Sequence, residues 1–340
     1  MAAVSSFDKL FSITAPHILE KIFLSLDLKS FINCFRVSRS WNILLTSESF
    51  QEMAKPIFYH DLTIELWHAC KKGNVQEVTN FFSSGLIDIN HISKRHGRTC
   101  LSIAAENGQR GVVQELLDRG ADPNISKFGL TPLYDAAREG HKDVVELLLD
   151  RGAEPNKVTP EERYTPLHRA VSKGHLHVVK VLLEKGASPN IRHKSGNTPL
   201  RTVHVSSMEN KRDLMKVLLE GGAEPHSRNS VGGTPLHYFA EAGCTEGVQL
   251  LLGKGVDPNI VDRSGMTPLR YAVEKGHKHV VQLLIDAGAN PNMADEKGKT
   301  PLIRAQEILD WWSGVHEQFR GQQEVDYAEI VNILKAKEFL

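Results

Sequence analysis

The sequence has few cysteines, and they are not arranged like the ligands of a metal or the partners of a disulfide framework. Cys34, Cys70, Cys100 and Cys244 are scattered over 340 residues, with no Cys-x-x-Cys pair. Structural zinc sites bring cysteines together in close pairs, and disulfides belong to oxidising compartments. We therefore interpret all four as small buried residues in a reducing compartment and predict neither a metal nor a cofactor.

Net charge and long apolar runs are also missing. Lys plus Arg and Asp plus Glu both number 41, so no net charge attracts nucleic acid or an anionic membrane. No apolar stretch approaches the ~20 residues of a membrane-spanning helix, and Met1 to Leu10 lack the features of a secretory signal. We expect no nucleic-acid or membrane partner, and a cytoplasmic or nuclear location.

The chain does contain a repeated motif. Thr-Pro-Leu occurs six times, at intervals of 33 to 36 residues, starting at Thr131, Thr165, Thr198, Thr234, Thr267 and Thr300. The first five copies are each followed, about twenty residues later, by Gly-Ala-Glu-Pro-Asn or a close variant. A period near 33 indicates stacked supersecondary units rather than one globular core. It also favours binding over catalysis.

One repeat can be interpreted residue by residue. Thr131 can cap a helix whose first position, Pro132, has no N–H to satisfy. Gly140 ends this helix in the way that a left-handed residue does. A second apolar face follows at 144–148, and Gly152 ends it. Each unit is therefore predicted to be helix, turn, helix and projecting hairpin.

These units resemble the ankyrin repeat, from Gly129-Leu-Thr-Pro-Leu to Gly152-Ala-Glu-Pro-Asn156. A degenerate first copy extends from about Ile64 to Asn90, which makes about eight repeats. The resemblance implies an all-α fold, an ankyrin-repeat α-solenoid with β-hairpin-like loops. An insertion near 307–326 interrupts the last copy, whose second helix we expect to begin near Tyr327. Trp311 and Trp312 within it either anchor a partner or cover the last repeat, and we favour covering.

The sixteen histidines do not require a catalytic or metal role. His168 and His237 follow Thr-Pro-Leu, and His141, His175 and His277 follow the glycine that ends a helix. We predict that they bond the repeat threonine or neighbouring backbone. The sequence has no Gly-x-Ser-x-Gly, phosphate loop, dinucleotide fingerprint or His-Glu-x-x-His. We therefore predict that the protein is not an enzyme.

The first sixty residues lack the repeat and carry large apolar side chains at helical spacing. Ile18-Leu-Glu-Lys-Ile-Phe23 and Val37-Ser-Arg-Ser-Trp41 resemble the F-box, although Thr14-Ala15 replaces its usual Leu-Pro opening. A segment this short buries little surface alone, so part of its apolar face needs a partner. We expect a small three-helix F-box-like domain at 10–55, a short linker at 56–63 and the ankyrin-repeat domain at 64–340.

The two resemblances imply two binding surfaces. The F-box family docks on a Skp-family adaptor, and through it a cullin, by apolar residues that here correspond to Pro16, Ile18, Leu19, Ile22, Phe23, Leu26, Phe31, Val37 and Trp41. Ankyrin stacks bind proteins through hairpin tips and first helices, which form a concave surface. Here those positions include Arg95, Arg98, Lys127, Phe128, Leu130, Arg138, Tyr164, Lys194, Arg263 and Met266. Two apolar tips among several bases would suit an acidic peptide with an apolar anchor.

These resemblances imply the substrate-recognition subunit of a cullin-type (SCF) ubiquitin ligase, a monomer apart from that complex. The alternative is a non-catalytic ankyrin scaffold or inhibitor whose N-terminal helices only cap the stack. The two hypotheses differ in whether Ile18, Ile22, Phe23 and Trp41 face outward.

Overall fold

The computed structural model describes residues 65–83, 88–93, 97–126, 128–203, 210–314 and 322–336. The predicted F-box and linker lie outside these residues, as do Arg95 and Lys127. The chain divides into two compact units, Met1–Glu154 and Pro155–Leu340. The described residues contain helices and loops but no β-strand, in agreement with the predicted all-α class.

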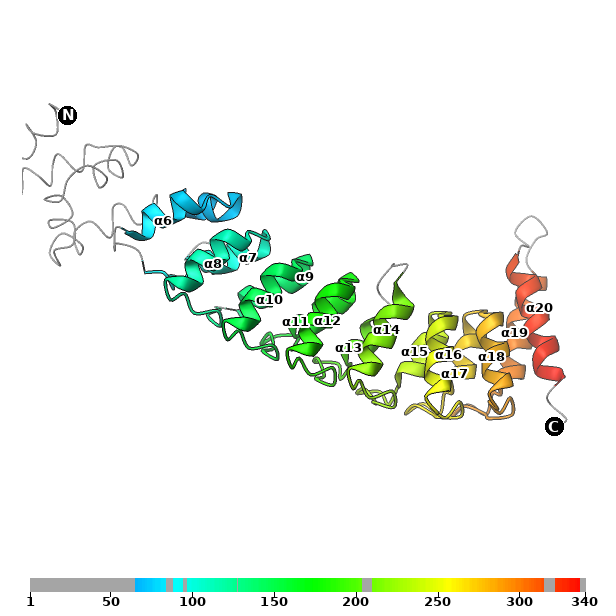
Figure 1. Cartoon of the computed structure of the whole chain (residues 1–340). Helices are drawn as coiled ribbons and strands as arrows, with labels where there is room; N and C mark the ends of the chain where they lie inside the picture. Colours follow the sequence, from blue (N-terminus) through cyan, green and yellow to red (C-terminus); the bar gives the residue numbers. More distant parts are fainter. Residues whose placement is uncertain are drawn as a thin grey trace, which may run out of the picture. The chain divides into compact units, whose positions relative to one another are not determined.

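The helices of each unit follow one another in antiparallel pairs (Figure 1). In the first unit, residues 65–72 are helical and precede α6 (Val75–Ser83), α7 (Cys100–Glu106), α8 (Arg110–Asp118), α9 (Pro132–Glu139) and α10 (Lys142–Asp150). The second unit contains α11 (Pro166–Lys173), α12 (Leu176–Glu184), α13 (Pro199–Thr202), α14 (Lys211–Glu220), α15 (Pro235–Glu241), α16 (Thr245–Gly253), α17 (Pro268–Glu274), α18 (Lys278–Asp286), α19 (Pro301–Ser313) and α20 (Gln322–Lys335).

Local sequence signals set the helix boundaries. The Thr131 hydroxyl accepts a hydrogen bond from the Tyr134 N–H, Pro132 occupies the first turn, and Gly140 follows the helix with a left-handed φ of 84°. Only glycine adopts such a φ without steric cost, so the helix ends there. The capping roles predicted for these residues are confirmed.

The core lies between the paired helices. Ala136 and Ala137 of α9 are fully buried, as are Val145 and Leu148 of α10. The short alanine side chains let neighbouring helices approach closely, and α9 contacts both α7 and α10. Burying a valine or leucine side chain stabilises the fold by about 1.5–3 kcal/mol.

Asparagines of the Pro-Asn motif connect successive repeats. Asn190 Nδ2 donates to the Gly222 carbonyl at 2.9 Å, and its Oδ1 accepts from the Glu224 N–H at 2.9 Å. Asn124 forms the same two bonds to Gly152 and Glu154 in the first unit. The motif thus joins the loop that follows the second helix of one repeat to the loop that follows the second helix of the next repeat.

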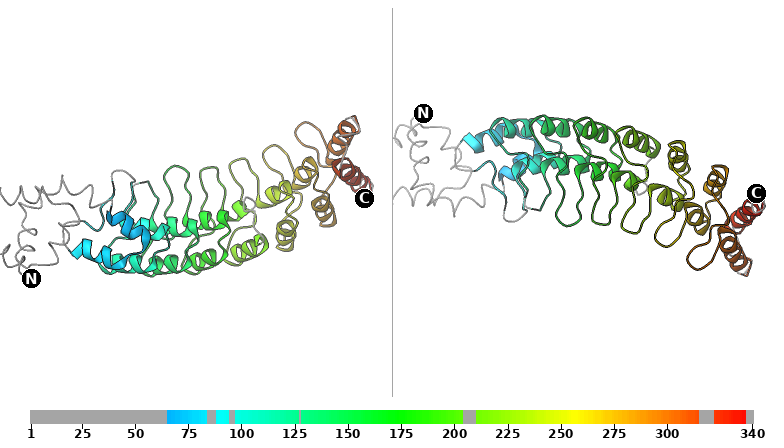
Figure 2. Two further views of the ribbon diagram at one scale, coloured as in Figure 1. Left: turned by 90° about the horizontal axis from the view of Figure 1, so that it is seen from above. Right: turned by 90° about the horizontal axis from the view of Figure 1, so that it is seen from below.

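The hairpin loops project from the helix pairs (Figure 2). They are closed by main-chain hydrogen bonds, such as that from the Asp262 N–H to the Met266 carbonyl at 3.0 Å. Adjacent hairpins of the second unit are also bonded, with the Arg263 N–H donating to the Val231 carbonyl at 3.1 Å. The predicted hairpin-like loops are present as turns, without strand pairing.

Two details differ from the sequence expectations. The second helix of the last repeat, α20, begins at Gln322 rather than near Tyr327, because part of the predicted insertion belongs to the helices on both sides. Cys70 is buried, but Cys100 and Cys244 are only half-buried. Interaction with the Cys100 thiol, followed by burial, raises the pKa of the Cys70 thiol, which keeps it protonated.

Candidate functional site

Residues that flank the Thr-Pro-Leu motifs of the second unit bring aromatic rings and guanidinium groups together. The Arg169 guanidinium lies 4.3 Å from the centre of the Tyr164 ring, and that of Arg201 lies 3.3 Å from the centre of the Tyr238 ring. A cation over an aromatic face is attracted by the ring quadrupole, which fixes the side chain in place. This arrangement therefore presents preorganised cationic and phenolic groups.

The hairpins hold these rings from the other side. The Asn229 side-chain amide donates to the Tyr238 hydroxyl at 2.6 Å, and the Tyr271 hydroxyl donates to Asp262 Oδ2 at 2.8 Å. Burial, followed by the Asp262 carboxylate, raises the pKa of Tyr271, so its phenol stays protonated and keeps donating. Each of these tyrosines thus links a first helix to the hairpin that precedes it.

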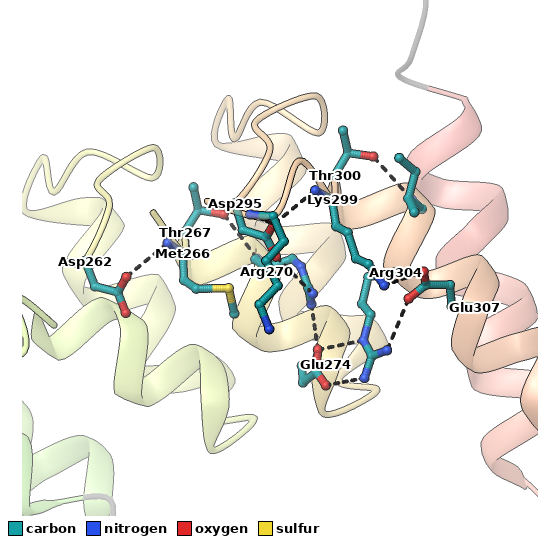
Figure 3. Close-up of polar contacts among 12 residues, drawn as sticks. Asp262, Met266, Thr267, Arg270, Glu274, Asp295, Lys299, Thr300, Arg304 and Glu307 are labelled. Carbon is teal, nitrogen blue, oxygen red and sulfur yellow. Dashed lines mark hydrogen bonds and ion pairs between the residues drawn. The ribbon is translucent and has the colours of Figure 1, made fainter. Parts of the chain in front are cut away.

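An open depression with a volume of about 490 Å³ lies between the last two described hairpins and their first helices. Figure 3 shows the polar contacts among residues of this region. Hairpin residues and helix residues line it together: Ser264, Met266, Arg270, Glu274, Asp295, Glu296, Lys297, Lys299 and Arg304. Charged groups predominate, and Met266 is the apolar member. Such a surface suits polar side chains of an extended peptide better than a small apolar ligand.

Glu274 is the centre of the charge network in this depression. Arg304 Nη2 and Nε donate to its two oxygens at 2.7 and 3.0 Å, and Arg270 Nη1 donates to it at 2.6 Å. These hydrogen bonds, that of Arg304 first, lower the pKa of Glu274 to about 2. Glu307 in turn accepts from Arg304 at 3.2 Å and from Lys299 at 2.6 Å. The network remains ionised at neutral pH.

Arg270 is the most buried of the lining cations, with 7% of its side chain exposed. Its Nη2 is 3.6 Å from Asp295 Oδ2, and its buried Nε has no hydrogen-bond partner. Asp295 Oδ1 is occupied by the backbone N–H groups of Lys297 and Lys299. The Glu274 and Asp295 carboxylates are thus largely occupied by internal bonds, while Glu296 and Lys297 add an exposed acid and an exposed cation at the rim.

The arrangement is suited to binding rather than to chemistry. The carboxylates of Glu274 and Glu307 are held in ion pairs, which favours their ionised form over a role in proton transfer. Among the described residues, no three His, Cys, Asp or Glu side chains gather as a metal site requires. Within the same residues, no helix is both long and apolar enough to cross a membrane.

Two of the predicted partner-binding bases are engaged inside the first unit. Arg98 Nη2 lies 2.6 Å from Oδ1 of the buried Asp135, and Arg98 also pairs with Glu106. Arg138 pairs with Glu106 at 2.6 Å and with Glu139 at 2.6 Å. Neither Asp135 oxygen has a well-aligned hydrogen bond, and burial raises the pKa of this carboxyl to about 7 against the opposing effect of Arg98. These arginines stabilise a charge cluster rather than forming a free basic patch.

The remaining predicted residues are divided between the two units. In the first, Phe128 is 57% exposed and Leu130 is half-buried. In the second, Lys194 and Arg263 are exposed, Met266 lines the depression, and Tyr164 packs against His168 and His193 with ring centres 5.6 and 5.0 Å away. Tyr164 therefore has a packing role that we did not predict.

The roles predicted for His168, His237, His141 and His277 are confirmed, and His141 Nε2 lies 2.9 Å from the Glu106 carbonyl. His168 Nδ1 is 2.8 Å from Thr165 Oγ1, and His237 Nδ1 is 2.9 Å from Thr234 Oγ1. His277 Nε2 is 2.9 Å from the Glu241 carbonyl, at the end of the preceding first helix. Burial lowers the pKa of His168 to about 4, so it is neutral at physiological pH.

Sequence reasoning missed the residues of the depression other than Met266. Glu241, Glu274 and Glu307 occupy the same repeat position, seven residues after the threonine that caps each first helix. Arg270 and Glu274 are spaced i,i+4, which brings them together on a helix. Aligning the repeats position by position would have revealed the recurring glutamate. It would not have revealed that Arg304 of the next repeat reaches Glu274.

Comparison with known proteins shows the family. A family model described as ankyrin repeats (3 copies) matches residues 66–159, 122–193, 158–220 and 203–295, so the chain belongs to the ankyrin-repeat family. A second model, described as the F-box domain, matches residues 16–52 and confirms the N-terminal resemblance. The matches do not test the count of eight repeats, which stays a prediction.

A solved structure supports the same fold. The ankyrin repeat domain of Bcl-3, described as a unique member of the IkappaB protein family, is 24% identical to this chain, with a TM-score of 0.57. The match covers 70% of this chain and 99% of that domain. At this identity the likeness shows the fold alone. A search of curated proteins found no match.

An F-box together with ankyrin repeats is, in general, the composition of an SCF substrate-recognition subunit. Both modules are typically non-catalytic, one binding an adaptor and the other a protein.

Proposed function

We propose that this protein is the substrate-recognition subunit of a cullin-type ubiquitin ligase. The observation that carries the proposal is the presence in one chain of an F-box match at 16–52 and ankyrin repeats at 66–295. The first part docks on a Skp-family adaptor, and the second holds a protein substrate. The subunit does no chemistry itself, but raises the effective concentration of substrate lysines near the ubiquitin-loaded enzyme.

The adaptor contact is assigned to the apolar residues of the F-box, with Ile22 and Phe23 at its centre. Burying a large apolar side chain at an interface contributes about 1.5–3 kcal/mol, and a carboxylate in the same place adds the cost of an unpaired buried charge. We propose the domain limits 10–55 and 64–340 for the two binding parts.

The substrate contact is assigned to the depression around Glu274. Its support is the combination of an open volume of about 490 Å³, hairpin and helix residues on both sides, and charges held in place by internal ion pairs. Preorganised groups lose little conformational freedom when a ligand binds. Phe128, exposed on a hairpin of the first unit, is proposed as a further contact.

Co-purification of the full chain with a Skp-type adaptor and a cullin tests the proposal. The wild-type chain should capture both, and the double variant Ile22→Asp, Phe23→Asp should lose the adaptor. The matched control is Ile303→Asp, which places a carboxylate on an exposed isoleucine of α19 and should capture the adaptor normally.

Circular dichroism should show that the ankyrin helices of each variant are intact. If the wild-type chain fails to bind any Skp-type adaptor while its helices are folded, the scaffold alternative replaces this proposal. If it binds the adaptor but Lys297→Glu and Phe128→Ala leave substrate ubiquitination unchanged, the substrate surface has been assigned wrongly.

A further inference from the structure

The last described helix pair is longer than those before it. The first helix α19 has 13 residues, whereas α15 and α17 have 7 each, and the second helix α20 has 14, whereas α16 and α18 have 9 each. The pair therefore continues past the ends of α17 and α18 (Figure 1). The extra turns lie beyond the helices that would otherwise bury one of their faces.

Ile303 lies at a repeat position that normally contacts the following unit. At the equivalent position, His168 reaches the Asn197 carbonyl, His237 reaches the Met266 carbonyl and Arg270 faces Asp295, each on the next hairpin. Ile303 is 46% exposed, although the equivalent side chains are buried. An apolar side chain at this position is thus largely exposed, whereas these earlier repeats hold a buried polar or charged one there.

Two further large apolar side chains are exposed on the same helix pair. Trp311 is 63% exposed and touches Trp312 edge to face, with ring centres 4.8 Å apart. Val325 is 51% exposed at the start of α20, next to Glu324, whose Oε1 accepts from Ser313 at 3.3 Å. That bond brings the start of α20 to the end of α19. Trp311 does not cover the last repeat, contrary to the interpretation that we favoured from the sequence.

Negative charge predominates where α19 ends and α20 begins, because the two bases of the pair, Arg304 and Lys335, lie toward the opposite ends of these helices. The described residues 305–314 and 322–334 contain five acids, Glu307, Asp310, Glu324, Asp326 and Glu329, and no Lys or Arg. Lys278 of the preceding unit is shared by Asp326 and Glu329, at 2.9 and 3.0 Å. Asp310 is exposed on α19 immediately before Trp311. Asp310 thus precedes Trp311 and Glu324 precedes Val325, whereas Glu307, Asp326 and Glu329 are held in ion pairs.

We propose that Ile303, Asp310, Trp311 and Val325 form a second docking surface, which binds a basic protein segment carrying an apolar anchor. Tryptophan is enriched among the residues that dominate interface energies, and a desolvated indole beside a carboxylate favours a Lys or Arg next to the anchor. A two-fold contact with a second copy of this chain would place these acids opposite one another, which disfavours self-association. The surface is distinct from the Glu274 depression and does not require the adaptor.

The test uses the full chain and three labelled peptides of matched length. The first contains Lys and Leu at helical spacing, the second has Glu in place of Lys, and the third has Gln in place of Leu. Fluorescence anisotropy should show binding of the first alone, and rising salt should weaken it. Trp311→Ala should reduce the affinity about tenfold, the loss expected of a moderate hot-spot residue. Asp310→Lys should reduce it as well.

Val231→Ser is the matched control, because Val231 is a similarly exposed apolar residue, at 54%, that belongs to neither proposed surface. It should bind the Lys/Leu peptide like the wild type. If Trp311→Ala changes the circular dichroism, Val325→Ser supplies the same test at a second exposed position.

Several results would overturn the inference: no binding of the Lys/Leu peptide, equal binding of the Glu/Leu peptide, or equal affinities for wild type and Trp311→Ala. Analytical ultracentrifugation tests the remaining occupant. A dimer that Trp311→Ala dissociates would assign the surface to a second copy instead. Adaptor capture is measured separately, so its failure is distinguishable from failure here.

Discussion

Arg304 binds both carboxylate oxygens of Glu274, with Nη2 2.7 Å from Oε1 and Nε 3.0 Å from Oε2. Glu274 is the last residue of α17, and Arg304 lies in the first turns of α19. The pair therefore joins the first helices of two successive repeats. Bidentate arginine–carboxylate pairs fix orientation as well as adding energy. The same carboxylate accepts a hydrogen bond from the buried Arg270. Glu274 therefore both joins two successive repeats and fixes one side of the depression.

Replacing Glu274 by Gln should make the fold less stable and less sensitive to acid. The folded-state pKa of Glu274 is lowered from 4.5 to about 2. Its contribution to stability is therefore present above the unfolded value and is lost as the pH falls from about 4.5 toward 2. At pH 7 we expect a loss of about 1–3 kcal/mol, toward the lower end because Glu274 is partly solvated. Urea unfolding at several pH values measures both effects.

Glu241→Gln is the control for this change, at the equivalent position one unit earlier. Glu241 faces Lys275 at 3.7 Å on a more exposed surface, so its loss should cost less than about 0.5 kcal/mol. Equal destabilisation by the two substitutions would show that the Glu274 network adds nothing beyond a surface ion pair.

Asp135 predicts the opposite pH dependence. Burial raises its pKa from 3.8 to about 7 in the folded state. The protonated carboxyl therefore stabilises the fold fully below pH 3.8, and this stabilisation is lost as the pH rises through about 7. Asp135→Asn lacks this titration, so the stability of the wild type relative to the variant should decline between about pH 4 and 7 and then remain constant.

Chemical unfolding of wild type and Asp135→Asn across that range measures the difference. Asp143→Asn, on the exposed surface of α10, is the control and should follow the wild type at every pH. A wild-type advantage that grows with rising pH would show that the ion pair with Arg98 outweighs burial.

The contrast between these two sites explains what the sequence could predict. The caps at Thr131 and Gly140, and the bond from His168 to Thr165, depend on neighbours within a few residues, so residue type and spacing were sufficient. The partner of Arg138 is Glu106, 32 residues away, and the sequence does not show which side chains meet across units. We therefore assigned Arg98 and Arg138 to a partner-binding surface without expecting their ion pairs with Asp135 and Glu106.

The C-terminal helix pair shows a second limit. We expected the second helix to begin near Tyr327, after an insertion near 307–326, because the repeat provides no template for extra residues. In the structure α19 continues to Ser313 and α20 already begins at Gln322, so part of this insertion is helical. Helix propensity is a weak prior over such short segments, and the packing that decides between helix and loop is not visible in the motif.

Replacing His226 by Asn should strengthen the junction between two successive repeats of the second unit. Asn190 and Asn259 each connect successive units, Asn259 donating to the Gly288 carbonyl at 3.0 Å and accepting from the Asn290 N–H at 2.7 Å. His226 occupies the equivalent position, is exposed, and forms neither bond in the structure. An asparagine there would have the Gly255 carbonyl and the Asp257 N–H as its partners.

His226→Asn should therefore raise the free energy of unfolding by about 1 kcal/mol, a typical net value for hydrogen bonds of this kind. Asn190→Ala should lower it by a similar amount, and urea midpoints at fixed pH measure both changes. A fall for Asn190→Ala without a rise for His226→Asn would show that the hairpin after His226 lies too far away to be bridged.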